Sequence, residues 1–385
     1  MTELDRIANA WDEAAKRGDS GVLATVIRVE GSTYRRAGAK LLLTSGGRRV
    51  GSVSGGCLEA DLVKKAWWLT AGGKAAIRYY DTSVEGEISQ GFGLGCNGVI
   101  HILLERLENS SVSTLEAATP VRCLREAAVV ATVTGAAPNS TVEIGQRWIR
   151  FPDGSVKTNI ASQELLSFIR SRTMGASEIG PAHITWNDRS QSVDVFVEPV
   201  MPRLRLLIFG AGDDAIPMAR QAQLLGYEVI VVDGRSHLAR VDRFPDADRI
   251  EAVSPHQFLE NTKLDNWTAV VLMSHSYAQD LAALATLATG RELPYVGALG
   301  PRKRTERMLS ELPASPEWLL NVLHSPVGLD IGADGPAQIA LAAVGEIQAV
   351  INKRSGGLLR RKAGPLDAER ESVGAYTPAA CSLDS

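Results

Sequence analysis

The sequence predicts an α/β protein with two principal parts: an amino-terminal α/β domain with glycine-rich loops, and a carboxy-terminal Rossmann-like domain built on a doubly wound parallel sheet. The length of 385 residues exceeds what one ordinary core accommodates. The segment Gly51 to Asp61 has the pattern of a strand that breaks into a small-residue loop before a helix. Further on, an apolar strand over residues 204–209 leads directly into Gly210-Ala211-Gly212.

Composition narrows the class of protein. Apolar residues make up 45% of the chain and charged residues 22%, as in a soluble globular protein, and a net charge of −3 offers no electrostatic surface for nucleic acid. The first twenty residues lack the apolar segment of a secretory signal, and no apolar run approaches a bilayer span. The 4 cysteines are widely spaced without a CxxC pair. We therefore expect a cytoplasmic protein with free thiols, no nucleic-acid partner and no membrane association.

The first elements of the chain follow from hydrophobic periodicity. Apolar residues at helical spacing predict an opening amphipathic helix, and strands are expected over residues 22–29 and 40–44. The loop between these strands contains Arg35 and Arg36. Because the guanidinium fork matches phosphate oxygens, the two arginines could clamp a phosphate or pyrophosphate. A solvated loop face explains them equally well.

The glycine-rich loop that follows leads into Cys57. The density of glycines in Gly51 to Gly56 indicates that the backbone needs positive φ angles or approaches a ligand closely. From Leu58 onward apolar residues recur at helical spacing, so Cys57 is expected in the first turn of a helix, where the peptide dipoles stabilise a thiolate. Cys57 is therefore the leading candidate for a reactive group. A tight turn with Cys57 as a small buried apolar residue fits the same pattern.

A second glycine-rich loop carries another cysteine, Cys96, directly after Gly95 and before a strand expected over residues 99–104. At these two loops the sequence resembles the XdhC/CoxI family, the accessory proteins of molybdenum hydroxylases such as xanthine dehydrogenase. The chain matches the family's GxxxGGCxE loop in full at Gly51 to Glu59. At the family's second loop, GxGCGG, the chain reads Gly95-Cys96-Asn97-Gly98.

The resemblance implies a function and a site. Proteins of this family bind molybdenum cofactor (molybdopterin), protect it, and deliver it in sulfurated form to an apo molybdenum hydroxylase, which implies contact with a sulfur donor such as a cysteine desulfurase. Cys57 would approach the metal or the pterin, because soft thiolates suit such a centre, and Cys96 ranks second. Further contacts with the cofactor are expected from residues around these thiols and from the arginine pair: Gly55, Gly56, Glu59, Gly95, Arg35 and Arg36.

The pattern changes over the middle of the chain, where no set of chemically reactive residues stands out. A helix is expected over residues 163–170, and short strands are expected over 129–134, 141–144, 147–151, 182–186 and 193–197. We interpret this region as a continuation of the amino-terminal domain that packs against it. The predicted limits are therefore 1–106 for the cofactor-binding domain, 107–203 for the continuation, 204–353 for the Rossmann-like domain and 354–385 for a disordered tail.

Strands and helices alternate from residue 204 onward. Gly210-Ala211-Gly212 opens the GxGxxA form of the dinucleotide fingerprint, and Asp233 closes the next strand about twenty residues later. The glycines Gly210 and Gly212 would admit a pyrophosphate and Asp233 would accept a hydrogen bond from a ribose hydroxyl, which predicts NAD(P) or another nucleotide. Asp213 and Asp214 oppose this ligand, because two negative charges at the helix start repel phosphate.

Other polar residues follow later strands of the same domain. His275 comes after a strand expected over 269–273, and Arg302 and Arg304 come after one expected over 295–299. Residues just past the carboxyl ends of parallel strands line the ligand crevice, although a solvated face explains the arginines equally well. The segment Ser325 to Gly332 and the amphipathic helix after it resemble the characteristic end of the family, and this helix would suit a homodimer.

The sequence thus predicts an accessory protein that binds and delivers molybdenum cofactor. An alternative is an NAD(P)-dependent oxidoreductase centred on Gly210, with His275 as general acid or base. That alternative lacks a second acid–base group at recognisable spacing, whereas the accessory function accounts for both cysteine loops. A third possibility is an interaction scaffold without a cofactor, which predicts that substituting Cys57 has no effect.

Overall fold

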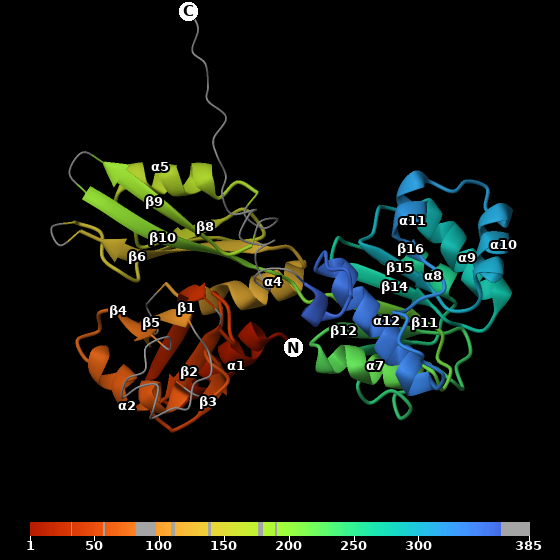
Figure 1. Ribbon diagram of the computed structural model, residues 1–385, viewed down its shortest axis with the longest axis horizontal. Helices are drawn as coiled ribbons and strands as arrows, with labels where there is room; N and C mark the ends of the chain where they lie inside the picture. The colour runs from red at the N-terminus through yellow and green to blue at the C-terminus, as the bar shows by residue number, and fades with distance from the viewer. Residues whose placement is uncertain are drawn as a thin grey trace, which may run out of the picture. The chain divides into compact units, whose positions relative to one another are not determined.

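The computed structural model describes residues 1–31, 33–56, 58–81, 98–108, 112–137, 140–175, 180–188 and 191–362. The chain forms two compact units, which consist mainly of Glu3–Pro202 and of Arg203–Arg361. We call them the amino-terminal unit and the carboxy-terminal unit, and Figure 1 labels their helices and strands. Among the described helices, none combines the length and the apolar character that crossing a membrane requires.

The amino-terminal unit begins with a five-stranded antiparallel sheet in the order β3-β2-β1-β5-β4. Its strands are β1 (Gly21–Gly31), β2 (Lys40–Thr44), β3 (Arg49–Gly51), β4 (Ala76–Asp81) and β5 (Gly98–Leu107). Side chains alternate along β1, so Val22 and Ala24 pack toward α2 (Glu59–Leu69) while Leu23 packs toward α1 (Glu3–Lys16). The sheet is therefore covered by a helix on each face.

A second five-stranded antiparallel sheet completes the same unit, in the order β8-β7-β6-β10-β9. Its strands are β6 (Ala128–Ala136), β7 (Arg147–Arg150), β8 (Val156–Thr158), β9 (Ala182–Asp188) and β10 (Gln191–Val200). Helix α5 (Gln163–Arg172) covers one face of this sheet (Figure 1), where Leu165 and Ile169 pack against Trp148. Short helices η1 (Thr114–Ala117) and α4 (Ala118–Leu124) precede β6.

Two buried ion pairs join the sheets of the amino-terminal unit. The guanidinium of Arg147 on β7 donates to both carboxylate oxygens of Glu105 on β5, each at 2.7 Å. Lys40 on β2 donates to Glu198 on β10 at 2.6 Å. All four side chains are less than one-tenth exposed. Since breaking a buried pair leaves an uncompensated charge, these contacts hold the two sheets in one arrangement.

A histidine adds a third link between the two sheets. Nε2 of His183 on β9 lies 2.8 Å from the carbonyl oxygen of Ile27, at the point where the pairing of β1 with β5 shifts by one residue. At such a bulge one residue is left out of the pairing between strands, and here the carbonyl oxygen of Ile27 is hydrogen-bonded to the histidine instead. Burial lowers the pKa of His183 below its usual value, despite the bond to the carbonyl of Ile27. The imidazole therefore favours its neutral form.

The carboxy-terminal unit contains one sheet of six parallel strands in the order β13-β12-β11-β14-β15-β16. The strands are β11 (Arg205–Phe209), β12 (Glu228–Val232), β13 (Arg249–Glu251), β14 (Thr268–Leu272), β15 (Tyr295–Ala298) and β16 (Leu323–His324). Numbered within the unit, this order is 3-2-1-4-5-6, which defines the Rossmann fold. The predicted fold class is confirmed.

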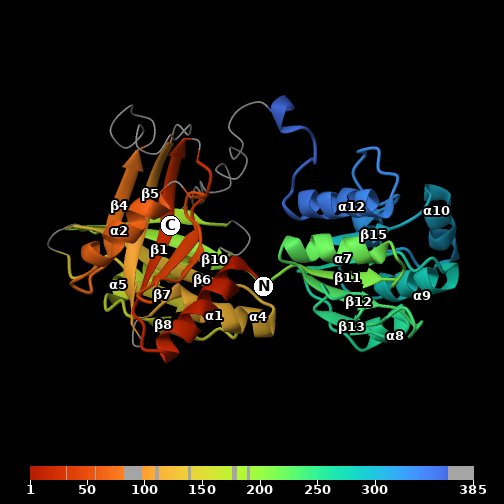
Figure 2. The ribbon, with the colours of Figure 1, turned by 90° about the horizontal axis from the view of Figure 1, so that it is seen from below.

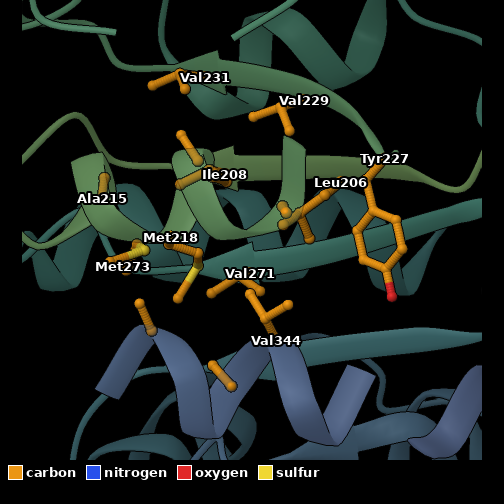
Figure 3. Packing of buried hydrophobic residues seen from close by; sticks show 14 of the residues in the cluster. Leu206, Ile208, Ala215, Met218, Tyr227, Val229, Val231, Val271, Met273 and Val344 are labelled. Atoms are coloured by element: carbon orange, nitrogen blue, oxygen red, sulfur yellow. The ribbon is translucent and has the colours of Figure 1, made fainter. Parts of the chain in front are cut away.

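Helices cover both faces of this parallel sheet (Figure 2). On one face, α7 (Ala215–Leu224) and α12 (Pro336–Ile351) share a buried apolar cluster with the sheet, which Figure 3 shows from close by. The helices packed on the other face are α8 (Pro255–Glu260), α9 (Tyr277–Ala288), α10 (Arg302–Glu311) and α11 (Glu317–Val322). Side chains of β11 serve both clusters, since Leu206 and Ile208 pack on the first and Leu207 on the second.

The structure differs from the sequence prediction in one element of the amino-terminal unit. Residues 141–144 form no strand, because the chain turns there and its apolar side chains separate. Val142 packs in the cluster beneath α5, whereas Ile144 packs between the two sheets. At the carboxyl end a short helix, η2 (Leu359–Arg361), closes the described chain, and residues 363–385 lie outside it, so the predicted disorder of the tail stays a prediction.

Candidate functional site

The glycine-rich loop of the amino-terminal unit folds around one carboxylate. Oε1 of Glu59 accepts hydrogen bonds from the Ser52 hydroxyl at 2.7 Å and from the backbone N–H groups of the next two residues, both at 3.0 Å. Oε2 accepts from the Ser54 hydroxyl and, at 2.9 Å, from the N–H of Gly56. Glu59 is also the first residue of α2, where a negative charge is favoured by the helix dipole. The donors of this loop thus bind a carboxylate that belongs to the protein itself.

These hydrogen bonds keep Glu59 ionised. Burial raises the pKa of this carboxyl, but the hydroxyls of Ser54 and Ser52 and the Ser54 amide outweigh it and lower the pKa to about 2. Three backbone N–H groups of the loop are directed at Glu59. The structure gives Glu59 a role in shaping the loop, and its predicted contact with the cofactor stays a prediction.

The thiols themselves lie outside the described residues, which exclude Cys57, Gly95 and Cys96. The residues before Cys57 are described. Gly55 and Gly56 have φ angles of +81° and +124°, which L side chains rarely adopt. Apart from its chain neighbours, no described atom lies within 4 Å of a Cβ added to Gly56. Helix α2 begins at Glu59, so Cys57 comes two residues before the helix. The chain therefore reaches Cys57 through an open, glycine-dependent turn.

The loop between β1 and β2 packs against this turn. A Cβ added to Gly55 would lie 2.7 Å from two ring carbons of Tyr34, so the tyrosine ring rests directly on the glycine backbone. Arg35 forms an ion pair with Glu3 on α1, whereas Arg36 is exposed. An anion that bound both arginines would have to compete with Glu3 for Arg35. The structure thus brings the arginine loop and the Cys57 loop together, with Arg36 as the exposed arginine.

The second candidate site lies in the carboxy-terminal unit, at the end of β11. Gly210 has a φ of +128°, and a Cβ there would lie 2.3 Å from the carbonyl oxygen of Met273, so only glycine fits. A Cβ on Gly212 would lie 2.6 Å from a carboxylate oxygen of Asp214. Gly210 thus allows two chain segments of the unit to approach closely, and Gly212 leaves room for the side chain of Asp214.

Asp233 is engaged within the protein. Its side chain is fully buried, and Oδ2 accepts the N–H of Ala211 at 2.8 Å. Arg235 donates from Nε to Oδ1 at 2.9 Å and from Nη2 to Oδ2 at 2.6 Å, and the same Nη2 lies 2.9 Å from the carbonyl oxygen of Ser274. Burial raises the pKa of Asp233, but the bonds from Arg235 outweigh it and the pKa is lowered. A ribose hydroxyl would have to compete with Arg235 for this carboxylate.

The structure places His275 beside the glycine loop of β11. Nε2 of His275 lies 2.7 Å from Oδ2 of Asp214, and the residue has a φ of +58°, a left-handed conformation that is uncommon outside glycine. Of the predicted arginines, Arg304 pairs with the buried carboxylate of Asp280 at 2.8 Å. Thus Asp214 already has a hydrogen-bond partner within the unit, and Arg304, like Asp233, has an ionic partner there.

Sequence reasoning missed several residues that shape these two sites. Arg235, two positions after Asp233, could have been noticed as a partner for the predicted acidic residue. Ser52 and Ser54 have no sequence signal beyond their small size. Tyr34 lies between a glycine and two arginines, and these more conspicuous residues drew the prediction away from it. In the described part of the chain, no three His, Cys, Asp or Glu side chains gather as a group that could hold a metal ion.

The fold and the two loops define a class of protein in which an α/β unit with a glycine-rich thiol loop precedes a Rossmann unit. A family model described as the XdhC and CoxI family matches residues 14–81, and one described as the XdhC Rossmann domain matches residues 206–347. The chain is 33% identical to a probable xanthine dehydrogenase subunit of Bacillus subtilis (strain 168), over 90% of this chain and 96% of that protein. The chain belongs to the XdhC and CoxI family, as the resemblance predicted.

Two further comparisons cover nearly the whole chain. The molybdenum cofactor insertion chaperone PaoD of Escherichia coli (strain K12) is 27% identical over 88% of this chain and 86% of its own length. A solved structure described as a xanthine dehydrogenase from Bacillus halodurans matches with a TM-score of 0.75 and 30% identity, over 96% of this chain and 100% of that one. Both units of this chain are therefore present in its relatives.

Proposed function

We propose that this protein binds molybdenum cofactor in its amino-terminal unit and inserts it into a molybdenum hydroxylase such as xanthine dehydrogenase. The observation that carries the proposal is the juxtaposition of the two loops. The Gly55-Gly56 turn leads into Cys57, and the Tyr34 to Arg36 loop packs against the same turn. An exposed aromatic ring and an exposed arginine on one loop, packed against the turn that leads into a cysteine, suit a cofactor that combines a flat pterin, a phosphate and a soft metal centre.

The comparisons support this function over that of a nicotinamide-dependent enzyme. One relative is named for molybdenum cofactor insertion and another as part of xanthine dehydrogenase, and each aligns with most of this chain. The carboxylate that would bind a ribose is held by Arg235 and the N–H of Ala211. In this proposal the cofactor is cargo, and the Rossmann unit has another task than hydride transfer.

The proposal extends to the state of the cofactor and to the partners. The cargo is the sulfurated cofactor, received with the help of a sulfur donor such as a cysteine desulfurase and passed to an apo hydroxylase, and the protein acts as a homodimer. Two measurements address this: mixing the loaded protein with apo xanthine dehydrogenase should restore xanthine oxidation, and light scattering should give twice the chain mass. Cofactor loaded without the sulfur donor should restore far less activity.

The binding step is tested by anaerobic titration with molybdenum cofactor, followed by measurement of molybdenum and pterin per chain. Wild type is compared with Cys57→Ala and with Cys123→Ala, a matched control at an exposed free cysteine of α4. We expect about one cofactor per chain in wild type and in Cys123→Ala, and loss of retention in Cys57→Ala. Binding by neither wild type nor control would contradict the carrier function.

A further inference from the structure

An exposed tyrosine stands at the centre of the two-loop arrangement. Tyr34 is 73% exposed although it packs on Gly55, and its hydroxyl has no hydrogen-bond partner among the described residues. One side of the ring is thus supported by backbone, and most of the ring surface faces solvent. A large aromatic side chain held in this way is a ready surface for another flat ring.

The loop that carries Tyr34 is held on both sides. The Thr33 hydroxyl donates to the carbonyl oxygen of Arg35 at 2.8 Å, and Arg35 is tied to Glu3 on α1. After the tyrosine, the N–H of Gly38 donates to the carbonyl oxygen of Val26 at 2.7 Å. The tyrosine is therefore positioned before any ligand arrives, which reduces the ordering that binding requires.

The surface beneath the ring depends on glycine and on Glu59. A side chain at Gly55 would collide with the ring, and the backbone from Val53 to Gly56 is fixed by the carboxylate of Glu59. Gly56 presents only backbone, and apart from its two chain neighbours no described atom lies within 4 Å of a Cβ added there. The ring of Tyr34 therefore lies on the turn that leads directly into Cys57.

We propose that Tyr34 is the stacking surface for the pterin ring of the cofactor. This inference rests on the proposed function and adds the residue and the contact that recognise the organic part of the cargo. The pterin is a flat conjugated ring with a π face, as nucleobases are, and stacking of a base on an aromatic side chain strengthens binding by about 5- to 150-fold. Arg36, two residues further along the same loop, is exposed.

The test measures binding of molybdenum cofactor itself, under anaerobic conditions, to wild type, Tyr34→Phe and Tyr34→Leu. Phenylalanine keeps the ring and leucine keeps apolar bulk without it. Trp68→Leu is the matched control, since Trp68 is 75% exposed and lies nine residues further along α2 than Glu59, about 14 Å away by helix rise. We expect Tyr34→Phe and Trp68→Leu to bind within about twofold of wild type, and Tyr34→Leu to bind about 5- to 150-fold more weakly.

A second measurement separates stacking from a merely structural effect on the loop. Stacking changes the absorption of the pterin, so the band of the bound cofactor should be shifted and weakened in wild type and in Tyr34→Phe. At saturation, Tyr34→Leu should lack this change. If Tyr34→Leu binds as wild type does, or if its bound cofactor has the wild-type absorption, the stacking role is wrong while the carrier function stands. If wild type itself does not bind, the proposed function fails and this inference fails with it.

Discussion

Replacing Glu59 by glutamine should open the loop before Cys57 without unfolding the unit. The carboxylate accepts hydrogen bonds from three backbone N–H groups and two hydroxyls. Glutamine keeps one acceptor oxygen, but its NH₂ group replaces the second oxygen and is itself a donor, so it cannot accept from the donors on that side. Hydrogen bonds to a charged group contribute about 1.5–3 kcal/mol each, but serine hydroxyls can rotate and Glu59 is partly exposed. We therefore expect a loss of about 2–3 kcal/mol in the free energy of opening this loop.

The assay is peptide-resolved hydrogen exchange of the purified protein. A loss of this size makes opening about 30- to 150-fold more frequent, so the amides of Val53, Ser54 and Gly56 should exchange faster by that factor in Glu59→Gln. Glu59→Asp keeps the charge but is one methylene shorter, so it should also speed exchange. The apolar core beneath α2 should keep its protection, because Leu58 and Leu62 stay buried.

The matched control is Glu13→Gln, an exposed carboxylate of the same unit that pairs with Arg48. Exposed ion pairs contribute little to stability, and neither Glu13 nor Arg48 is among the five donors to Glu59. Exchange over residues 53–56 should be unchanged in the control. If Glu59→Gln also leaves this segment within twofold of wild type, the carboxylate does not hold the loop and the reasoning is refuted.

Three further predictions concern the rest of the fold. Arg147→Met leaves Glu105 buried without its partner and should lower the free energy of unfolding of the amino-terminal unit by about 3–5 kcal/mol in urea titrations. The double variant with Glu105→Leu should recover most of this lost stability. No loss in the single variant would contradict the buried pair. Burial holds the pKa of His183 below its unfolded value of about 6.5, so the unfolded state binds more protons below that pH. The free energy of unfolding of this unit should therefore fall from pH 7 to pH 5. His183→Gln should make this free energy depend less on pH. An unchanged pH dependence would show that other groups set it. Gly210→Ala places a Cβ against the carbonyl of Met273 and should lower the melting temperature of the carboxy-terminal unit by several degrees in calorimetry; an unchanged transition would mean that the backbone there yields freely.

The sequence predicted the regular elements of the fold where the pattern was long or strongly apolar. The strand expected over residues 40–44 is β2, and the Rossmann strands were placed to within a residue or two. The three-residue strands β8 and β13 and the two-residue β16 were missed, because so short a segment has no readable period. The strand expected over 141–144 was wrong, since its alternating apolar residues belong to two different clusters.

The candidate site was less accessible to prediction, because its contacts join distant segments. Sequence reasoning identified the loop at Gly55 and Gly56 and gave Glu59 a place in it. It could not show that the carboxylate turns back onto five donors, which requires the three-dimensional course of the loop. Nor could spacing reveal that Tyr34, some twenty residues earlier, rests on Gly55. Local signals located the loops, and tertiary contacts gave the residues in them their roles.

The charge pairs between the two antiparallel sheets bear on how this protein can be divided. A fragment that ended at residue 106 would keep Glu105 and Lys40 but lose Arg147 and Glu198. It would also lose Phe196 of β10, which packs with Ile27 and Leu103 of the first sheet. We therefore expect the smallest fragment that folds with the thiol loop to extend to about Pro202. Where gene fusion or fission rearranges proteins of this kind, we expect the second antiparallel sheet to stay with the first, and the carboxy-terminal unit to be the part that separates.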